Sequence, residues 1–505
     1  MVAEIRCSSA DDLLDSQQGG HVDAGLHARV VEYRSPSRRR KGKILKQYCK
    51  KTNVQSLRFI KHCIFECLNG KWSRRDVHEL LAQFCDWDIE NIASCAMTIQ
   101  NRPQLYPVID QMAAHIQKCL KSHDIDLPRA RNRTIQDGIT KKKRQITIAS
   151  IVQQIYDYIA KVGLQELFDV KFAPHQFATI KGRGQTFGKK FNEKWMNEIK
   201  QECKGGKNVS GKPASTCAID ADVRKCYPSM SIGKLKAHLK RDVRNKELLW
   251  LTFYLIDKMT REKYNLRNDR LKKSTVRFVS GNGLRGVRVR RGISIGSYLS
   301  CNLCNYMVSY AWHYLQEQAC RWEMRKGKDG VYRRTRVRLI THCDIYMDNF
   351  TIYGKNKRDL MRTEHMLETY MRKELGMRIK PSWRLYRLAY KDKRGKEHGS
   401  PVDAMGYVVY RDRTRMRGKI FLRARRKFIR LRKAKLQKKR PSKRLCGSVI
   451  AYNGWFSNSN ARKWQSKNDF KYHVFKTARK EMGKYMREEA AYARLCEMQR
   501  TAAAG

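Results

Sequence analysis

Two aspartates in this sequence stand where an ionised carboxylate is costly. Asp222 ends the short apolar segment AIDAD, and Asp348 lies in the middle of the hydrophobic segment DIYMDNFTIYG. A carboxylate at the edge of a buried strand must be paired with a base or must bind a metal. For either residue alone, a buried salt bridge is the simpler explanation. Two aspartates on neighbouring strands can also hold two Mg²⁺ ions about 4 Å apart, as phosphoryl transfer requires.

The charge of the chain predicts a polyanionic partner. Its 505 residues include 108 Lys and Arg against 47 Asp and Glu, a formal net charge of +61. Residues 38–51 hold eight basic residues without an acid, and residues 411–444 hold eighteen with one acid. Nucleic acid is the expected partner of such a chain.

The composition also bears on localisation. The sequence shows no apolar stretch of the roughly 18 residues that a membrane span needs, and no secretory signal pattern. Its 16 cysteines are scattered, without the spacing of a disulfide framework. We therefore expect a cytoplasmic protein without a membrane partner.

Alternating apolar residues predict the strands that would position the two aspartates. The segment TCAIDADV predicts a short strand ending near Asp222, and residues 339–354 predict two strands joined by a turn at Met347 and Asp348. Residues 133–148 predict a hairpin turning at Asp137 and Gly138. The Gly-, Ser- and Lys-rich residues 201–216 predict a loop. Helical periodicity is predicted over residues 55–125, 151–167, 293–315 and 358–375, the last ending at Gly376.

Segments between residues 130 and 465 resemble, in order, the motifs of bacterial reverse transcriptases, close to those of retrons, diversity-generating elements and antiphage-defence systems. ADVRKCYPSM resembles the first catalytic palm motif, and RRGISIGSYLSCNLCNYM resembles the next. IYMDNFTIYG resembles the Tyr-x-Asp-Asp hairpin, ELGMRIKPSW the motif after it, and VDAMGYVVYRDRTRMRG the primer-grip hairpin. DGITKKKRQITI and KGRGQTFGKKF resemble the fingers, and SVIAYNGWFSNSNARKW resembles the thumb.

The resemblance implies an α+β fold of the right-hand polymerase type, with fingers, a palm built on a small antiparallel sheet, a helical thumb and a helical N-terminal extension. The expected parts are a flexible tail (1–35), a basic helical N-terminal extension (36–130), fingers (131–215), a palm (216–410) with a finger-side insertion at about 235–290, and a basic helical thumb with a C-terminal helix (411–505).

The resemblance also implies roles for single residues. Asp222, Asp348 and the general acid Lys380 would be catalytic, although a solvated lysine explains Lys380 equally well. Asp222, Val223 and Asp348 would hold Mg²⁺ or Mn²⁺. The implied dNTP-binding residues are Arg144, Tyr227, Gly296 and Ser297, with Lys142 and Lys143 beside Arg144. The implied nucleic-acid-binding residues are Arg183, Tyr346, Met347, Gly406, Tyr407, Arg425 and Arg426.

Nucleotide choice depends on Tyr227. A bulky aromatic five residues after the first aspartate leaves no room for a ribose 2′-OH, so the resemblance implies dNTP substrates. The alternative is that Tyr227 is a core aromatic beside Pro228.

Two departures from the family pattern bear on activity. Asn349 replaces the second aspartate of the hairpin motif, which lowers the charge available to a metal. Asp220 and Asp344 are only weak substitutes for it. The second departure is Ser-Ile-Gly at residues 294–296, where many retroviral-type enzymes have Pro-Gln-Gly.

The sequence therefore predicts an RNA-directed DNA polymerase, a nucleotidyltransferase that adds dNTPs to a primer 3′-OH or a protein hydroxyl by two-Mg²⁺ phosphoryl transfer. The resemblance implies bacterial antiphage defence and an RNA template, which could be a dedicated non-coding RNA. Three alternatives stay open: template-independent DNA synthesis, a catalytically dead RNA-binding scaffold, and an RNA polymerase. The sequence does not decide the template, the primer, the oligomeric state or the role of residues 1–130.

Overall fold

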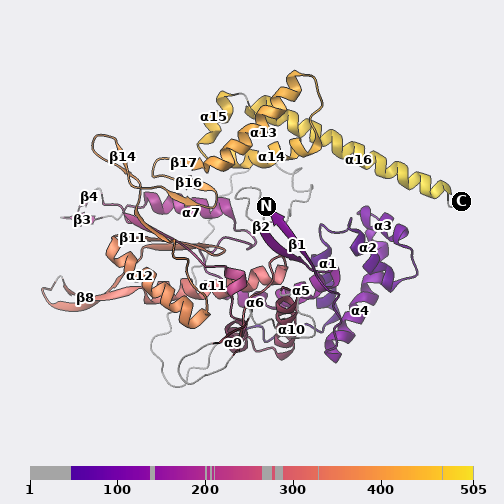
Figure 1. Ribbon diagram of the computed structural model, residues 1–505, viewed down its shortest axis with the longest axis horizontal. Helices are drawn as coiled ribbons and strands as arrows, with labels where there is room; N and C mark the ends of the chain where they lie inside the picture. Colours follow the sequence, from indigo (N-terminus) through magenta and orange to yellow (C-terminus); the bar gives the residue numbers. More distant parts are fainter. Residues whose placement is uncertain are drawn as a thin grey trace. The chain divides into compact units, whose positions relative to one another are not determined.

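The structure is a computed structural model, whose helices and strands are labelled in Figure 1. The chain divides into two compact units. Unit 1 comprises Met1–Lys171 and Tyr227–Met307, and unit 2 comprises Phe172–Cys226 and Val308–Gly505. The predicted tail (1–35), the turn at Asp137 and Gly138, and Lys142 lie outside the described residues. The described residues are 47–136, 143–199, 202–204, 207–209, 211–263, 276–278, 288–327, 329–468 and 470–503.

Unit 1 is mainly helical. In α1 (Leu57–Leu68) the residues Ile60, Cys63, Ile64 and Cys67 are buried at helical spacing, and this face packs against α4 and α5. The further helices of unit 1 are α2 (Arg75–Leu81), α3 (Ile89–Met97), α4 (Tyr106–Ser122), α5 (Ile151–Gly163), α6 (Gln165–Lys171), α9 (Ile232–Asp242) and α10 (Lys246–Lys263), with 3₁₀ turns at Ala82–Phe84 and Arg102–Leu105.

Two small hairpins and two boundary helices complete unit 1. The hairpins pair β1 (Arg131–Gln136) with β2 (Lys143–Ile148), and β6 (Val276–Phe278) with β7 (Arg288–Arg290). The short helix α8 (Cys226–Ser229) and the long helix α11 (Tyr298–Gln318) each run from one unit into the other.

A four-stranded antiparallel sheet forms the centre of unit 2. Its order is β10-β11-β5-β12, with β10 at His342–Tyr346, β11 at Asn349–Gly354, β5 at Cys217–Asp222 and β12 at Arg384–Arg387. Helix α12 (Lys357–Tyr370) contacts β5, β11 and β12, while residues of α7 (Gln185–Asn197) share a buried cluster with strand residues. These helices explain why β5 and β11 are apolar along most of their length, since strands covered on both faces lack a polar side.

The rest of unit 2 consists of small sheets and C-terminal helices. In the C-terminal helices, Phe428, Phe456 and Phe470 form one aromatic core. The strands are β3 (Glu202–Lys204) with β4 (Lys207–Val209), β8 (Cys320–Lys326) with β9 (Tyr332–Arg338), β13 (Tyr390–Lys391) with β14 (Glu397–His398), and β15 (Val402–Ala404), β16 (Tyr407–Val409) and β17 (Thr414–Met416). The helices are α13 (Gly418–Leu436), α14 (Lys443–Ser457), α15 (Ala461–Lys467) and α16 (Phe475–Ala503), with π-helical turns at Met371–Leu375 and Phe470–Val474.

The structure corrects two expectations about local structure. The predicted helix at 293–315 begins only at Tyr298, because the Thr147 amide on β2 donates a hydrogen bond of 2.8 Å to the Ile295 carbonyl and holds this segment beside the strand. The predicted loop at 201–216 contains β3 and β4, separated in the sequence by Gly-Gly, a pair typical of tight hairpins. No helix within the described ranges is both long and apolar enough to cross a membrane.

Candidate catalytic carboxylate site

The register of the four-stranded sheet brings Asp222 and Asp348 together. Asp222, the last residue of β5, pairs with Asn349, the first residue of β11, so the turn residue Asp348 lies directly beside it. The Val223 amide donates a hydrogen bond of 2.9 Å to the Asp348 carbonyl and fixes this arrangement. The turn is tight, because Met347 adopts the left-handed conformation with φ of 58°. Two aspartates far apart in the sequence therefore share one end of the sheet.

The two carboxyl groups affect each other electrostatically. Burial, with the neighbouring charge of Asp222, raises the pKa of Asp348 to about 6, and Lys380 acts in the opposite direction. Asp222 Oδ1 is buried and has no hydrogen-bond partner in the described part of the chain. The site thus concentrates negative charge that its own hydrogen bonds satisfy only in part.

Lys380 supplies a positive charge at this point. Its ammonium group ion-pairs with Asp222 Oδ2, and its backbone amide donates a hydrogen bond of 2.8 Å to the Asp222 carbonyl. The preceding residue is also held, because the Ile379 amide donates to Glu368 Oε2 at 2.7 Å. Lys380 therefore belongs to the carboxylate site and is not the freely solvated lysine that the sequence left open.

The donor set fits a divalent cation. Carboxylate oxygens are the ligands that Mg²⁺ takes, and Mg²⁺ commonly uses only one or two of them together with substrate phosphates. Asp222 offers the buried Oδ1. A bound cation would favour the ionised form of Asp348, as Lys380 already does by lowering the pKa of that carboxyl. Asn349 is exposed next to them and brings a neutral amide. Clusters of three or more His, Cys, Asp or Glu with metal-binding geometry do not occur within the described residues.

Asp220 and Asp344, the weak substitutes for the missing aspartate, have other partners. Asp220 accepts hydrogen bonds from Arg384 at 2.8 Å and from Tyr386 at 3.0 Å. Asp344 is buried and accepts one from the Asn192 amide at 2.8 Å. Burial raises the pKa of Asp344 to about 7. Both side chains therefore hold the sheet and its neighbours together. No local pattern in the sequence indicates these partners, which lie more than 150 residues away along the chain.

The residues predicted to bind the dNTP lie in unit 1. Arg144 is exposed on β2, and Tyr227 is half-buried in α8. Gly296 has φ of +124°, and a Cβ there would lie 2.4 Å from the Thr147 carbonyl oxygen, so only glycine fits. The Ser297 hydroxyl donates to Asp157 Oδ2 at 2.6 Å. Contacts of these residues with a nucleotide stay a prediction.

The residues predicted to bind nucleic acid lie in unit 2, and several have structural partners. The Arg183 guanidinium donates to the carbonyls of Ala173 and Gln176, at 2.6 and 3.2 Å, and so fastens the segment before α7. Gly406 has φ of +82°, and a Cβ there would collide with the Trp455 ring at 2.6 Å. The remaining predicted residues are Tyr346 at the end of β10, Met347 in the turn, Tyr407 beside the Trp455 ring, and Arg425 and Arg426, exposed on α13.

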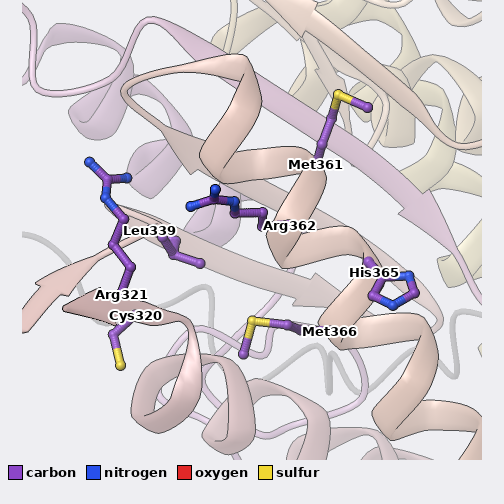
Figure 2. Close-up of a pocket in the computed structure, with 7 residues that line it drawn as sticks. All are labelled: Cys320, Arg321, Leu339, Met361, Arg362, His365 and Met366. Atoms are coloured by element: carbon purple, nitrogen blue, oxygen red, sulfur yellow. The ribbon is translucent and has the colours of Figure 1, made fainter. Parts of the chain in front are cut away.

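A hollow of about 530 Å³ lies apart from the carboxylates (Figure 2). It is formed by the base of β8 and by α12, and none of the predicted catalytic residues lines it. Its lining residues are Cys320, Arg321, Leu339, Met361, Arg362, His365 and Met366. Met361 is among the exposed large apolar side chains.

The end of the sheet thus brings together the paired aspartates and the lysine beside them. Residues 131–383, half of the chain, match the family described as reverse transcriptase (RNA-dependent DNA polymerase). The chain belongs to this family. The prediction of a nucleotidyltransferase of the reverse transcriptase class is thereby confirmed.

The chain can also be compared with solved structures and with curated proteins. The structure of telomerase from Candida albicans, in complex with a TWJ fragment of telomeric RNA, is similar over 62% of this chain, with 10% sequence identity and a TM-score of 0.32. The similarity covers 50% of that telomerase, so the chain spans about half of its length. Among curated proteins, none matches the sequence at a significant level.

Proposed function

We propose that the chain is an RNA-directed DNA polymerase that adds dNTPs to a primer 3′-OH or to a protein hydroxyl. One observation carries the proposal: Asp222 and Asp348 meet at one end of the four-stranded sheet, and Asp222 keeps a buried oxygen without a hydrogen-bond partner in the described residues. Mg²⁺ is usually bound through one or two carboxylates together with substrate phosphates, and this pair supplies two.

The proposal assigns the elements to the parts of a right-hand polymerase. The four-stranded sheet with α12 is the palm, β1 and β2 belong to the fingers, and α13 to α16 form the thumb. Exposed basic residues on α13, among them Arg425 and Arg426, support a role of the thumb in holding phosphates. The four helices between Leu57 and Ser122 would form the N-terminal extension.

Each residue of the carboxylate site would have its own role in nucleotide addition. Asp222, Asp348 and the Val223 backbone would hold Mg²⁺ or Mn²⁺, which neutralises the triphosphate charge when bound. Lys380 lies at the carboxylates and would release Asp222 to protonate the departing pyrophosphate. Tyr227 would exclude a ribose 2′-OH, and Arg144 would contact the triphosphate.

The test is primer extension by the purified full-length protein on an RNA template with dNTPs. Asp222→Asn and Asp348→Asn should each lower the rate by more than about 100-fold, since bound metal stabilises the transition state by several kcal/mol. Asp412→Asn removes an exposed carboxylate of unit 2 in the same way and should leave the rate unchanged. Wild-type rates in both catalytic variants, with thermal melting intact, would refute the proposal.

A catalytically dead RNA-binding scaffold is the second candidate, and two observations favour it. Asn349 stands in place of an aspartate, and Lys380 already neutralises Asp222. A scaffold would bind RNA but incorporate no nucleotide with either Mg²⁺ or Mn²⁺. Its biological function would also survive Asp222→Asn, whereas that of a polymerase would not.

The biological setting is a further part of the proposal. The motif resemblance supports a bacterial, cytoplasmic enzyme of antiphage defence that copies a dedicated non-coding RNA. Sequencing the nucleic acid that co-purifies with the protein would test this, because DNA complementary to one defined RNA is the expected result. DNA without a complementary RNA would indicate template-independent synthesis, and incorporation of NTPs would indicate an RNA polymerase.

A further inference from the structure

The hairpin of β8 and β9 has two faces of different chemistry. In an antiparallel pair, directly opposite residues lie on the same face and successive residues alternate. The register pairs Trp322 with Arg336, Met324 with Arg334, and Lys326 with Tyr332. We call these six residues the aromatic face. The other side, the ion-paired face, consists of Arg321, Glu323, Arg325, Arg333, Thr335 and Val337.

Carboxylates neutralise the arginines of the ion-paired face. Arg325 pairs with Glu323 at 2.9 Å, and Arg333 pairs with Asp329. Arg321 pairs with Glu323 and with Asp359 of α12, so this side of the hairpin is tied to the helix beside it. The basic residues of this face are accounted for by contacts within the protein.

The aromatic face has cations without acids. None of its six residues is a carboxylate, and no ion pair of Lys326, Arg334 or Arg336 occurs with the described residues. Trp322 is 54% exposed and Tyr332 is 63% exposed. The Arg334 guanidinium lies over the Trp322 ring, 4.9 Å from its centroid. Large exposed aromatics gathered on one surface indicate a binding site.

The chemistry of this face fits a nucleic-acid strand. Bases stack on exposed aromatic rings, while Lys and Arg between the rings contact phosphates. We propose that the aromatic face binds single-stranded RNA, with bases on Trp322 and Tyr332 and phosphates against Lys326, Arg334 and Arg336. Four residues of strand separate the two rings, roughly 13 Å, so that one strand reaches both.

The hairpin lies away from the carboxylate site. Strand β9 leads into β10 at the end opposite the turn that holds Asp348, and Figure 1 shows β8 projecting beside α12. RNA on this face is therefore a part of the strand outside the segment being copied. The choice of RNA rests on the proposed function, because an RNA-directed polymerase must hold an RNA, whereas the face itself is defined by the hairpin alone.

The test measures binding of a labelled 20-nucleotide single-stranded RNA to the full-length protein, freed of co-purifying nucleic acid, in EDTA without dNTPs. The aromatic variant carries both Trp322→Ala and Tyr332→Ala. Loss of each ring should weaken RNA binding at least about fivefold. Arg334→Gln with Arg336→Gln should lower the slope of log K against log salt by about 1.4, or 0.7 for each phosphate contact.

The hairpin provides its own matched control. Arg325→Gln with Arg333→Gln removes the same charge from the same two strands on the opposite face, and should change RNA binding less than about twofold. Equal losses in the two arginine pairs, or unchanged RNA binding in the aromatic variant, would overturn the inference. The inference would also be overturned if the aromatic variant lost binding to single-stranded DNA of the same sequence but kept its binding to RNA.

The binding assay separates this inference from the proposed function. Asp222→Asn protein should bind RNA as the wild type does, because neither metal nor dNTP is present. If the wild type synthesises no DNA but the aromatic variant still loses RNA binding, the proposed function fails and the RNA surface stands.

Discussion

Replacing Lys380 should tighten metal binding and slow catalysis at the same time. In the structure its ammonium group pairs with Asp222 Oδ2, so its charge opposes a divalent cation that uses both aspartates. Lys380→Gln removes this competitor and leaves a more negative site. The expected result is a stronger affinity for Mn²⁺ in the absence of nucleotide, together with a lower rate of nucleotide addition at saturating metal.

The size of the effect follows from the exposure of the pair. Two unit charges about 4 Å apart interact by about 4 kcal/mol at an effective dielectric constant of 20. The Lys380 and Asp222 side chains are 37% and 34% exposed, and ion pairs so accessible to water are worth only about 1 kcal/mol after screening. Loss of the competitor should therefore lower the Kd for Mn²⁺ by roughly fivefold.

The assay is a titration of free Mn²⁺ followed by electron paramagnetic resonance. Lys380→Arg keeps the charge and should bind Mn²⁺ as the wild type does. Lys391→Gln removes a lysine of unit 2 from an exposed pair with Asp412, and serves as the matched control. Unchanged or weaker Mn²⁺ binding in Lys380→Gln would refute the view that the lysine charge opposes the cation.

Three further predictions concern other parts of the chain. Tyr227→Ala should raise ribonucleotide incorporation about tenfold or more in competition assays, whereas Tyr227→Phe should retain selectivity for dNTPs. Gly296→Ala should lower the free energy of unfolding by about 1–3 kcal/mol, because its Cβ would meet the Thr147 carbonyl oxygen at 2.4 Å; Gly233→Ala, in open space, should not. Burial raises the pKa of Asp344 from 3.8 to about 7, so its contribution to stability is complete below about pH 4 and is lost as the pH rises through 7. Between pH 4 and 8, the free energy of unfolding of Asp344→Asn, measured in urea, should fall by on the order of 2–4 kcal/mol less than that of the wild type. Parallel pH profiles of the two proteins would contradict the assignment.

The local parts of the site could be predicted from the sequence. An apolar run that ends in Asp222, and two apolar runs joined around Asp348, specify strands and a tight turn through the two-residue period alone. Gly376, with φ of 67°, ends the helical segment as its position predicted. These features depend on neighbouring residues, which the sequence displays directly.

The pairings between distant segments could not be predicted in the same way. Lys380 and Asp222 are 158 residues apart, and Asn192 and Asp344 are 152 apart. Their contacts follow from the strand order β10-β11-β5-β12 and from the helices packed on the sheet, and no local period encodes these. The two faces of the β8–β9 hairpin could not be predicted for a similar reason. Only the register of the two strands shows which charged residues share a face.

The site also explains how Asn349 can be tolerated. Residue 349 lies directly opposite Asp222 on the neighbouring strand, and two like charges in such a cross-strand pair destabilise a sheet. An aspartate there would add a third negative charge beside Asp348, whose pKa already rises to about 6 through burial and the charge of Asp222. Lys380 balances only one of these charges. With asparagine at 349, Asp222, Asp348 and Lys380 together carry one net negative charge in the metal-free site. When Lys380 moves away from Asp222, the net charge becomes two negative charges, which favours a bound cation.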